Sequence, residues 1–290
     1  MDMDKELKAI AEDSWLTHVR NYVPSAWIGH APFMRFLIRE LKPATFVELG
    51  THNGFSYFVA CQTVQELKLP TKTFAVDHWI GDPHAGEFDD SVYEGVLALN
   101  AQYQNFSTLL KMSFLDARSK FKDGTVNLLH IDGFHTYEAV KEDFETWLPK
   151  MAPNSVVIVH DIQVRHADFG VFKYWSELKA KYRTIELTGS YGLGVVFLGT
   201  TISTQLNNLI EFSKTGNLMQ IQGVFGGLND VAVQTYRNLE ASTFEQQLAT
   251  VNGQLADSTY YINTLLNSRS WKITKPLRAV TEFLRKVLGK

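Results

Sequence analysis

The sequence predicts an α/β protein with a doubly wound, mostly parallel sheet, and three observations support this prediction. Short apolar runs alternate with helical patterns from residue 45 to residue 199. The runs are apolar throughout, as expected for strands that are buried on both faces. The last two runs, TIELTG and GVVFLG, are joined by a short glycine-rich link without a helix. We therefore expect parallel strands with helical crossovers and an antiparallel last strand.

Residues 1–44 are predicted to form an N-terminal helical segment that precedes the sheet. Its last helix is expected over about residues 31–41, because Phe33, Phe36 and Leu37 share one helical face and Pro43 follows. Residues 200–235 are predicted to form an irregular helical linker that is interrupted by its glycines, Gly223, Gly226 and Gly227.

The C-terminal residues carry two further patterns. Apolar residues recur at alternating spacings of four and three from Phe244 to Leu265, which predicts a short coiled coil over residues 236–268 and a possible homo-oligomer. Residues 269–290 carry seven basic side chains and one acidic side chain, and they predict a basic amphipathic tail.

Composition limits the kind of protein that this chain can form. The net charge of −3 gives no general attraction to nucleic acid, and 45% hydrophobic residues allow a full core. The lone Cys61 excludes a disulfide framework, and we expect a buried, inert thiol. The N-terminus does not resemble a signal peptide, and no apolar run approaches membrane-spanning length. We therefore expect a cytoplasmic protein.

The ends of the first two strands indicate a nucleotide-like cofactor. VELGTHNG places Glu48, Gly50 and Gly54 in a strand-to-helix turn, and TFAVDHW ends in Asp77, which is placed to accept hydrogen bonds from ribose hydroxyls. NAD would prefer a GxGxxG pattern, whereas Thr51 and His52 stand where glycine would be needed. The sequence therefore favours S-adenosylmethionine, a methyl donor without a pyrophosphate, over a hydride carrier.

The next two strands end in a second group of polar residues. In LLHIDGFHTYEAV, Asp132 ends a strand and His135 follows three residues later, while Asp161 ends the neighbouring strand VVIVHD. Two converging carboxylates repel each other unless they are protonated or bound to a cation such as Mg²⁺. A cation would orient a substrate hydroxyl, and His135 would accept its proton as the methyl group arrives. The alternative is a metal-free site in which the acids orient His135.

Two other regions have competing interpretations. The loop HWIGDPHAGEFDD is predicted to hold a polyhydroxylated substrate, with Trp79 stacked on a sugar face; the alternative is a solvated surface loop. His130 precedes Ile131 inside a predicted strand, and we expect a core histidine whose hydrogen bonds are satisfied.

The ordered motifs VELGTHNGFSY, AVDHWIGDPHAG, LLHIDGFHTYEAVKEDFETWLP and VVIVHDI resemble the class I S-adenosylmethionine-dependent methyltransferases. The resemblance covers roughly residues 25–200 and is to a subgroup found with bacterial surface-polysaccharide genes. It implies a seven-stranded Rossmann-like methyltransferase sheet and an O-methyltransferase that acts on a sugar hydroxyl in polysaccharide or glycan biosynthesis. Two other classes stay open: a non-catalytic cofactor-binding subunit that organises glycan-assembly enzymes, and a Rossmann-type oxidoreductase.

The resemblance also implies a set of cofactor-binding residues. Glu48, Gly50 and Gly54 would line the methionine end, Asp77 the ribose, and Ser113 and Phe114 the adenine, although MSFLDARSKF lacks the GD pair common at that position. The full implied set is Glu48, Gly50, Thr51, Asn53, Gly54, Asp77, His78, Ser113, Phe114 and Asp132.

The acids and histidines are similar to those of metal-dependent sugar O-methyltransferases of macrolide pathways. That resemblance implies His135 and Asp132 as catalytic residues and a Mg²⁺ or Mn²⁺ site formed by Asp132, His160 and Asp161. His160 stands where those enzymes carry an acid, and imidazole shifts the preference toward Mn²⁺ or other transition ions, or removes the metal.

The tail contains SWKITKPLR, which resembles a terminal motif of polysaccharide-assembly enzymes, including glycosyltransferases. A basic amphipathic helix suits an anionic membrane surface, which would place the protein at the inner face of the membrane, or a groove on a partner glycosyltransferase. The alternative is a helix that folds back on its own domain.

Overall fold

The computed structural model describes residues 3–84 and 86–288, and the chain divides into two compact units, Met1–Tyr236 and Arg237–Lys290. The division falls next to the predicted end of the helical linker. The strands are β1 Thr45–Leu49, β2 Lys72–Asp77, β3 Gly81–Asp82, β4 Gly86–Glu87, β5 Ser107–Lys111, β6 Val126–Ile131, β7 Met151–His160, β8 Arg183–Leu187 and β9 Leu193–Leu198.

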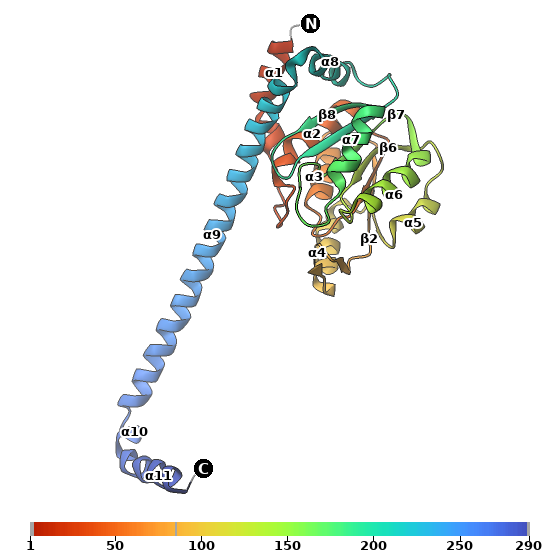
Figure 1. Ribbon diagram of the computed structural model, residues 1–290. Helices are drawn as coiled ribbons and strands as arrows, with labels where there is room; N and C mark the ends of the chain where they lie inside the picture. Colours follow the sequence, from red (N-terminus) through yellow and green to blue (C-terminus); the bar gives the residue numbers. More distant parts are fainter. Residues whose placement is uncertain (1–2, 85, 289–290) are drawn as a thin grey trace. The chain divides into compact units, whose positions relative to one another are not determined.

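Helices connect these strands and flank them in the chain (Figure 1). The α-helices are α1 Met3–Ala11, α2 Ala31–Leu41, α3 Phe55–Glu66, α4 Asp90–Asn100, α5 Phe114–Ala117, α6 Tyr137–Trp147, α7 Val171–Lys181, α8 Thr204–Phe212, α9 Leu218–Asn267, α10 Arg269–Ile273 and α11 Lys275–Leu288. Short 3₁₀ turns lie at Ser14–Thr17, Ile28–His30, Ala101–Tyr103, Arg118–Lys120 and Leu148–Lys150, and a π-type segment lies at Ser213–Asn217.

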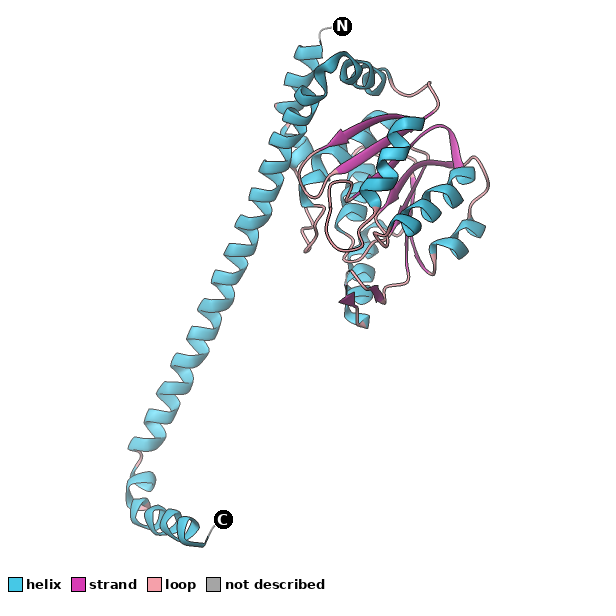
Figure 2. Ribbon diagram, viewed as in Figure 1, coloured by secondary structure: helices cyan, strands magenta, loops and turns pink. Residues whose placement is uncertain are grey.

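The first unit is built on a seven-stranded sheet with the order β5-β2-β1-β6-β7-β9-β8. Figure 2 shows its strands in magenta among the cyan helices. β9 is antiparallel to both neighbours, β7 and β8, and the pairs formed by β5, β2, β1, β6 and β7 are parallel. The predicted fold class is confirmed, including the antiparallel last strand. This order is that of the Rossmann-like methyltransferase sheet. A separate small ribbon pairs β3 with β4.

Strand register brings the polar residues together at one edge of the sheet. Leu49 at the end of β1 pairs with Val76 of β2 and with Ile131 of β6, and Ile131 pairs with Val159 of β7. These parallel strands therefore end level, and the residues that follow them share one edge.

Alternating residues of each strand build two apolar cores, one on each face. Phe46 and Leu128 pack on the face covered by α2 and α3, whereas their neighbours Val47 and Leu129 pack on the face covered by α6 and α7. Cys61 of α3 lies buried in the first core, where burial raises the pKa of its thiol to about 12. The thiol is therefore protonated and inert, as predicted.

The N-terminal segment packs into the first unit. α2 has the predicted extent and ends where Lys42 adopts a left-handed conformation with φ 47°. The buried Arg35 of α2 makes a 2.7 Å ion pair with Glu66 of α3 and lies 3.9 Å from the ring of Trp15. Cation–π and charge-pair contacts of this kind tie the segment to the α2 and α3 layer.

Gly223, Gly226 and Gly227 do not interrupt a helix, so the prediction that they break the linker is wrong. α9 runs continuously through Gly223, Gly226 and Gly227. Each helical glycine costs about 1 kcal/mol relative to alanine, but a buried stripe of the same helix offsets this cost. The stripe includes Ile221 and Phe225. The break lies earlier, at Gly216 with φ 87°.

The second unit consists of the rest of α9 followed by α10 and α11. Large apolar side chains lie exposed along its part of α9, namely Leu239, Phe244, Leu248, Val251, Leu255, Tyr260, Tyr261, Ile262, Leu265 and Leu266. Within residues 3–84 and 86–288, no helix combines the length and the apolar character that a membrane span requires.

Candidate active site

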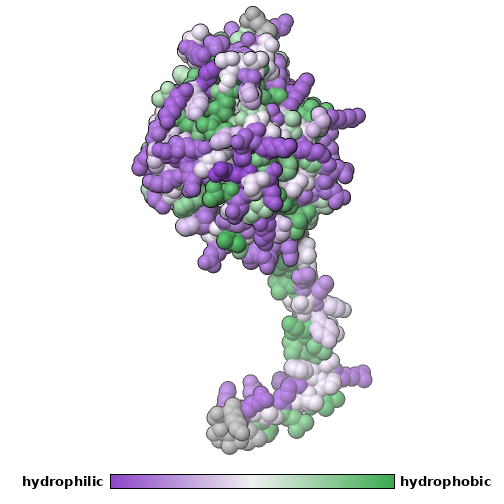
Figure 3. All heavy atoms as spheres, turned by 90° about the vertical axis from the view of Figure 1, so that its right-hand side faces the viewer, coloured by the Kyte–Doolittle hydropathy of each residue, from purple (hydrophilic) through white to green (hydrophobic). Residues whose placement is uncertain are grey.

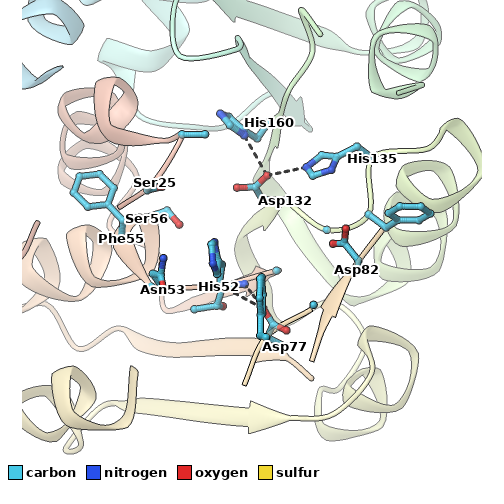
Figure 4. A pocket seen from close by; sticks show the side chains of 18 of the residues that line it. Ser25, His52, Asn53, Phe55, Ser56, Asp77, Asp82, Asp132, His135 and His160 are labelled. Atoms are coloured by element: carbon cyan, nitrogen blue, oxygen red, sulfur yellow. Dashed lines mark hydrogen bonds and ion pairs between the residues drawn. The ribbon is translucent and has the colours of Figure 1, made fainter. Parts of the chain in front are cut away.

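A cavity of about 490 Å³ opens at the edge where β1, β2, β6 and β7 end (Figure 4). This volume is typical of a small-molecule site. Its lining comes from widely separated parts of the chain: Pro24, Ser25, Ala26, Gly50, Thr51, His52, Asn53, Gly54, Phe55, Ser56, Asp77, His78, Gly81, Asp82, Phe88, Phe114, Asp132, Gly133, Phe134, His135, His160 and Asp161.

Gly50 shapes the turn between β1 and α3. Its φ is 86°, and a Cβ at this position would lie 2.0 Å from the carbonyl oxygen of Asp132. Only glycine permits this left-handed backbone and this close approach to the end of β6. Thr51, which follows, is buried and lines the cavity, and no described group hydrogen-bonds its hydroxyl. A buried hydroxyl without a partner is available for a ligand.

Asp77 holds the same turn from the end of β2. Its Oδ2 accepts hydrogen bonds from the backbone N–H groups of Thr51 and His52, at 2.8 and 3.0 Å, and its Oδ1 accepts one from Trp79 at 2.7 Å. A carboxylate offers about four acceptor positions, so one remains for a ribose hydroxyl. The role of Asp77 is therefore partly to brace the turn.

Two residues of the predicted cofactor set do not line the cavity. The side chain of Glu48 lies under the sheet face covered by α2 and α3, where its Oε2 lies 2.8 Å from Nδ1 of His130. Strand alternation explains this, because Leu49 and not Glu48 ends β1. Ser113 caps α5 by accepting a hydrogen bond from the backbone N–H of Asp116. Gly50, Thr51, Asn53, Gly54, Asp77, His78, Phe114 and Asp132 do line it.

His130 is buried beside Glu48, and only one of its two ring nitrogens has a hydrogen-bond partner within the described part of the chain. Its Nδ1 faces Glu48, while its Nε2 and Oε1 of Glu48 have no hydrogen-bond partner among the described groups. The ring of Trp27 lies edge-on against His130, with ring centroids 5.1 Å apart. The expectation of a core histidine holds, whereas that of full satisfaction does not.

Asp132, His135 and Asp161 lie close together, as their positions after neighbouring strands predicted. His135 Nε2 lies 2.8 Å from Asp161 Oδ2 and 3.7 Å from Asp132 Oδ1. Figure 4 shows Asp132 between His135 and His160. The loop after β7 allows this arrangement because Asp161 adopts a left-handed backbone with φ 60°, which aspartate tolerates better than most residues.

His160 donates from both ring nitrogens. Its Nδ1 lies 3.1 Å from Asp132 Oδ1, and its Nε2 lies 2.9 Å from the carbonyl oxygen of Ser190. Carboxylate and carbonyl oxygens only accept, so both nitrogens must carry protons and the ring is an imidazolium. The same carbonyl oxygen faces Nε2 of His30 at 3.1 Å.

The pKa shifts agree with this hydrogen-bond pattern. Burial alone would lower the pKa of His160, but Asp132 and Asp161 outweigh it and raise the pKa well above its usual value. Burial also opposes a charged His135, yet the same two carboxylates raise its pKa to about 9. Burial would raise the pKa of Asp132, but the charge of His160 and contacts with both histidines hold it well below its usual value. Two carboxylates thus meet two imidazolium groups.

The structure changes the candidate metal set. Asp132, His135 and Asp161 each offer one ligand atom, and these atoms lie within 4.8 Å of one another. His160 was the predicted nitrogen ligand, but neither of its nitrogens has a free lone pair in this arrangement. Two carboxylate oxygens and one imidazole nitrogen fit Mn²⁺ better than Mg²⁺, which prefers oxygen donors throughout. A metal would therefore be held by His135, which could not then act as a base.

The predicted substrate loop forms the β3–β4 ribbon and the segments beside it. Trp79 was expected to stack on a sugar, and this is wrong: its ring is 2% exposed, packs on Tyr93 and donates its indole N–H to the carbonyl of His52. In sequence, an aromatic residue beside glycines is equally compatible with an exposed ring that stacks on a ligand and with a buried ring that anchors the loop.

His84 of the ribbon reaches the catalytic candidates instead. Its Nδ1 lies 3.3 Å from Nδ1 of His135, and its Nε2 lies 2.7 Å from Asp168. The sequence placed His84 and Phe88 in the predicted substrate loop without giving either a role, and Phe88 stacks on the ring of His52 at 4.4 Å. Pro24, Ser25 and Ala26 were missed. No spacing rule links such distant residues, so only the fold could identify them.

Comparisons with known proteins find one family model and several similar chains. Residues 47–162 match a family model described as a methyltransferase domain. The uncharacterized protein y4gI of Sinorhizobium fredii is 48% identical over 182 residues, which are 63% of this chain and 20% of that protein. This chain thus spans about a fifth of the length of that relative.

Similar solved structures have low sequence identity. The O-methyltransferase TomG of Streptomyces achromogenes is 17% identical, with 68% of this chain and 91% of that chain covered and a TM-score of 0.46. A methyltransferase of Podospora anserina, PaMTH1, is 13% identical, with 69% of this chain and 96% of that chain covered and a TM-score of 0.46. An O-methyltransferase of Bacillus cereus is 14% identical, with 67% of this chain and 89% of that chain covered and a TM-score of 0.44. Residues 47–162 thus match a methyltransferase domain, and the strand order observed in the first unit agrees with that match.

Proposed function

We propose that this protein is an O-methyltransferase that transfers the methyl group of S-adenosylmethionine to a sugar hydroxyl, with His135 as the general base. The observation that carries the proposal is the cavity itself. It joins a glycine turn and Asp77 on one side to the Asp132, His135 and Asp161 cluster on the other. A cofactor-binding half and an acid–base half thus share one cavity.

The cofactor would lie along the ends of β1 and β2. The start of α3, just after Gly54, presents backbone N–H groups of positive character, which suit the methionine carboxylate. The free hydroxyl of Thr51 and the remaining acceptor position of Asp77 add polar contacts. Bound there, S-adenosylmethionine supplies the methyl group as a positively charged sulfonium.

The acceptor hydroxyl would lie against His135, which removes its proton. The Nε2–H group of His135 donates a hydrogen bond to Asp161 Oδ2, which fixes the orientation of the ring. The substrate proton would therefore be accepted at Nδ1, the nitrogen that lies 3.3 Å from Nδ1 of His84. A positive charge brought into the cavity lowers the pKa of a neighbouring imidazolium, so cofactor binding favours the neutral form that can act as a base. Asp132 would remain ionised beside the acceptor.

A polyhydroxylated acceptor suits the outer lining. Ser25, His78 and Asp82 contribute hydroxyl, imidazole and carboxylate groups there, which match the many donors and acceptors of a sugar. A glycan pathway is consistent with the sequence resemblance and is part of the proposal.

We propose that catalysis is metal-free, because the imidazolium of His160 already balances the carboxylates. In the competing version, Asp132, His135 and Asp161 would hold Mg²⁺ or Mn²⁺, and the ion would orient and acidify the hydroxyl. Excess chelator separates the two: it leaves turnover unchanged in the metal-free version and abolishes it in the other.

The decisive experiment combines binding with turnover. Calorimetric titration of the purified protein with S-adenosylhomocysteine should give saturable binding, and labelled S-adenosylmethionine should transfer its methyl group to soluble sugars. His135→Ala should lower turnover by about 10²–10⁴-fold and leave cofactor affinity within a few-fold. Binding without transfer to any sugar or other hydroxyl acceptor would favour a non-catalytic subunit. Nicotinamide binding without S-adenosylhomocysteine binding would favour an oxidoreductase.

A further inference from the structure

The second unit ends in a helix whose charged and apolar residues are fully separated. In α11, successive residues are about 100° apart around the axis. On this spacing, Leu277, Val280 and Phe283 occupy one arc, and Lys275, Arg278 and Lys286 lie on the opposite side. The three apolar side chains are 70%, 57% and 66% exposed, so no described part of the chain covers them. Hydrophobic side chains, green in Figure 3, lie exposed along this part of the molecule.

The preceding short helix, α10, extends both properties. Trp271 and Ile273 are exposed, and the Arg278 guanidinium lies 3.7 Å from the centre of the Trp271 ring. Arg278 also donates to the carbonyl of Trp271, so α10 and α11 form one locally ordered element. Tryptophan and arginine together are typical of elements that lie at the boundary between lipid and water.

Charge is distributed very unevenly along the chain. Residues 269–290 hold seven of the 28 basic residues but one of the 31 acidic residues. The other 268 residues therefore contain 21 basic and 30 acidic side chains. A strongly basic end on an acidic protein indicates an anionic target, and the exposed apolar arc indicates that the target also offers apolar contact.

We propose that α10 and α11 bind the surface of a membrane that contains anionic phospholipids. The apolar arc would enter the boundary between headgroups and acyl chains, and the basic side chains would contact lipid phosphates. A bilayer surface offers both interactions along the whole length of a helix. Specific protein grooves take the apolar face of a helix but do not require a charge excess of this size.

The test uses the full chain and two vesicle types, one of phosphatidylcholine alone and one of equal parts phosphatidylcholine and phosphatidylglycerol. The protein should sediment with the anionic vesicles, and added salt should release it because the charges are exposed. Replacing Lys275, Arg285 or Lys286 by glutamine should weaken binding about five-fold for each charge removed.

A matched pair of variants isolates the apolar arc. Val280→Glu and Ala279→Glu add the same charge at neighbouring exposed positions, but only Val280 lies in the arc. Both should lose about five-fold from the added charge, and Val280→Glu should lose at least about ten-fold more because a buried apolar contact is lost. Circular dichroism would check that both helices form.

Three results would overturn the proposal: equal binding to neutral and anionic vesicles, equal losses in the two variants, or no vesicle binding by the full chain. The last result would point to a protein groove. S-adenosylhomocysteine affinity should be the same in every variant, so this proposal can fail while the proposed catalytic function stands.

Discussion

The contact between His135 and Asp161 affects the pKa of His135, and therefore the pH at which His135 can act as the proposed base. A raised pKa of about 9 means that the free protein carries a protonated His135 at neutral pH. When S-adenosylmethionine is limiting, kcat/KM reports the ionisation of the free protein, so it should rise with pH and level off above about 9.

Asp161→Asn should move this pH profile to lower pH. The variant removes a carboxylate that favours the charged imidazole, so the pKa of His135 should fall toward its usual value and the rise in kcat/KM should move to lower pH. The measurement is the pH dependence of initial rates in both proteins. Identical profiles would assign the ionisation to another group.

A second residue-scale prediction concerns the positive charge of His160. His160→Asp replaces an internal cation by a third carboxylate, and such a cluster should bind divalent ions. We expect Mn²⁺ or Mg²⁺ to raise the melting temperature of this variant but not that of the original protein. His160→Asn is the control: it should be less stable by about 3–5 kcal/mol and show no response to either ion. A response in the original protein would instead support the competing metal-bound site.

The candidate site was predictable from sequence where strand ends determine position. Asp132 and Asp161 follow adjacent parallel strands, and Asp77 and Gly50 follow the neighbouring ones, so their meeting required only the sheet order. The direction of a side chain at a strand end was not predictable. Glu48 lies one residue before the end of β1 and points into the core, and Trp79 turns inward to close its loop.

At the scale of elements, the β1–α3 turn leads to a prediction with an internal control. Gly50→Ala should abolish S-adenosylhomocysteine binding and lower stability, because the added Cβ meets the Asp132 carbonyl and the backbone is left-handed. Gly223→Ala makes the same change in an exposed part of α9 with open space around it, and should raise stability by about 0.4–1 kcal/mol. Calorimetry and urea unfolding measure the two effects, and equal behaviour of the variants would contradict the role of the turn.

The seam of α9 gives a second element-scale prediction. Its apolar residues lie exposed at heptad spacing, and a second copy of the same helix would cover them. We expect the full chain to form a homo-oligomer, and Leu255→Lys, within the seam, to yield monomers. Ala249→Lys lies off the seam and should leave the assembly intact. Sedimentation equilibrium distinguishes these states, and a monomeric full chain would exclude the coiled coil.

Helix extents were predictable only in part, for a related reason. The face of α2 is apolar at helical spacing and a proline follows it, so local signals defined its extent. In α9, local signals favoured an interruption at three glycines, but packing of Ile221 and Phe225 against the first core outweighed them. Tertiary contacts of that kind cannot be read from a single helix.

At the scale of the whole molecule, we expect the first unit to bind the cofactor and transfer the methyl group, and the second unit to bind membranes. Deleting residues 237–290 should leave S-adenosylhomocysteine affinity and methyl transfer to a small soluble sugar unchanged, because all described lining residues lie in the first unit. The same deletion should abolish vesicle binding. Loss of cofactor affinity on deletion would show that the second unit contributes to the site, and the assignment of separate roles would then be wrong.

The link between β8 and β9 has a consequence for how the site tolerates mutation. Four of its five residues, Gly189 to Gly192, have positive φ, and this backbone path directs the Ser190 carbonyl at both His30 and His160. Because the acceptor belongs to the main chain, no side-chain replacement at position 190 can delete it. Genetic variation there should be silent as long as the backbone path survives, whereas a proline, whose φ is fixed near −65°, should disrupt the charged cluster from outside the cavity.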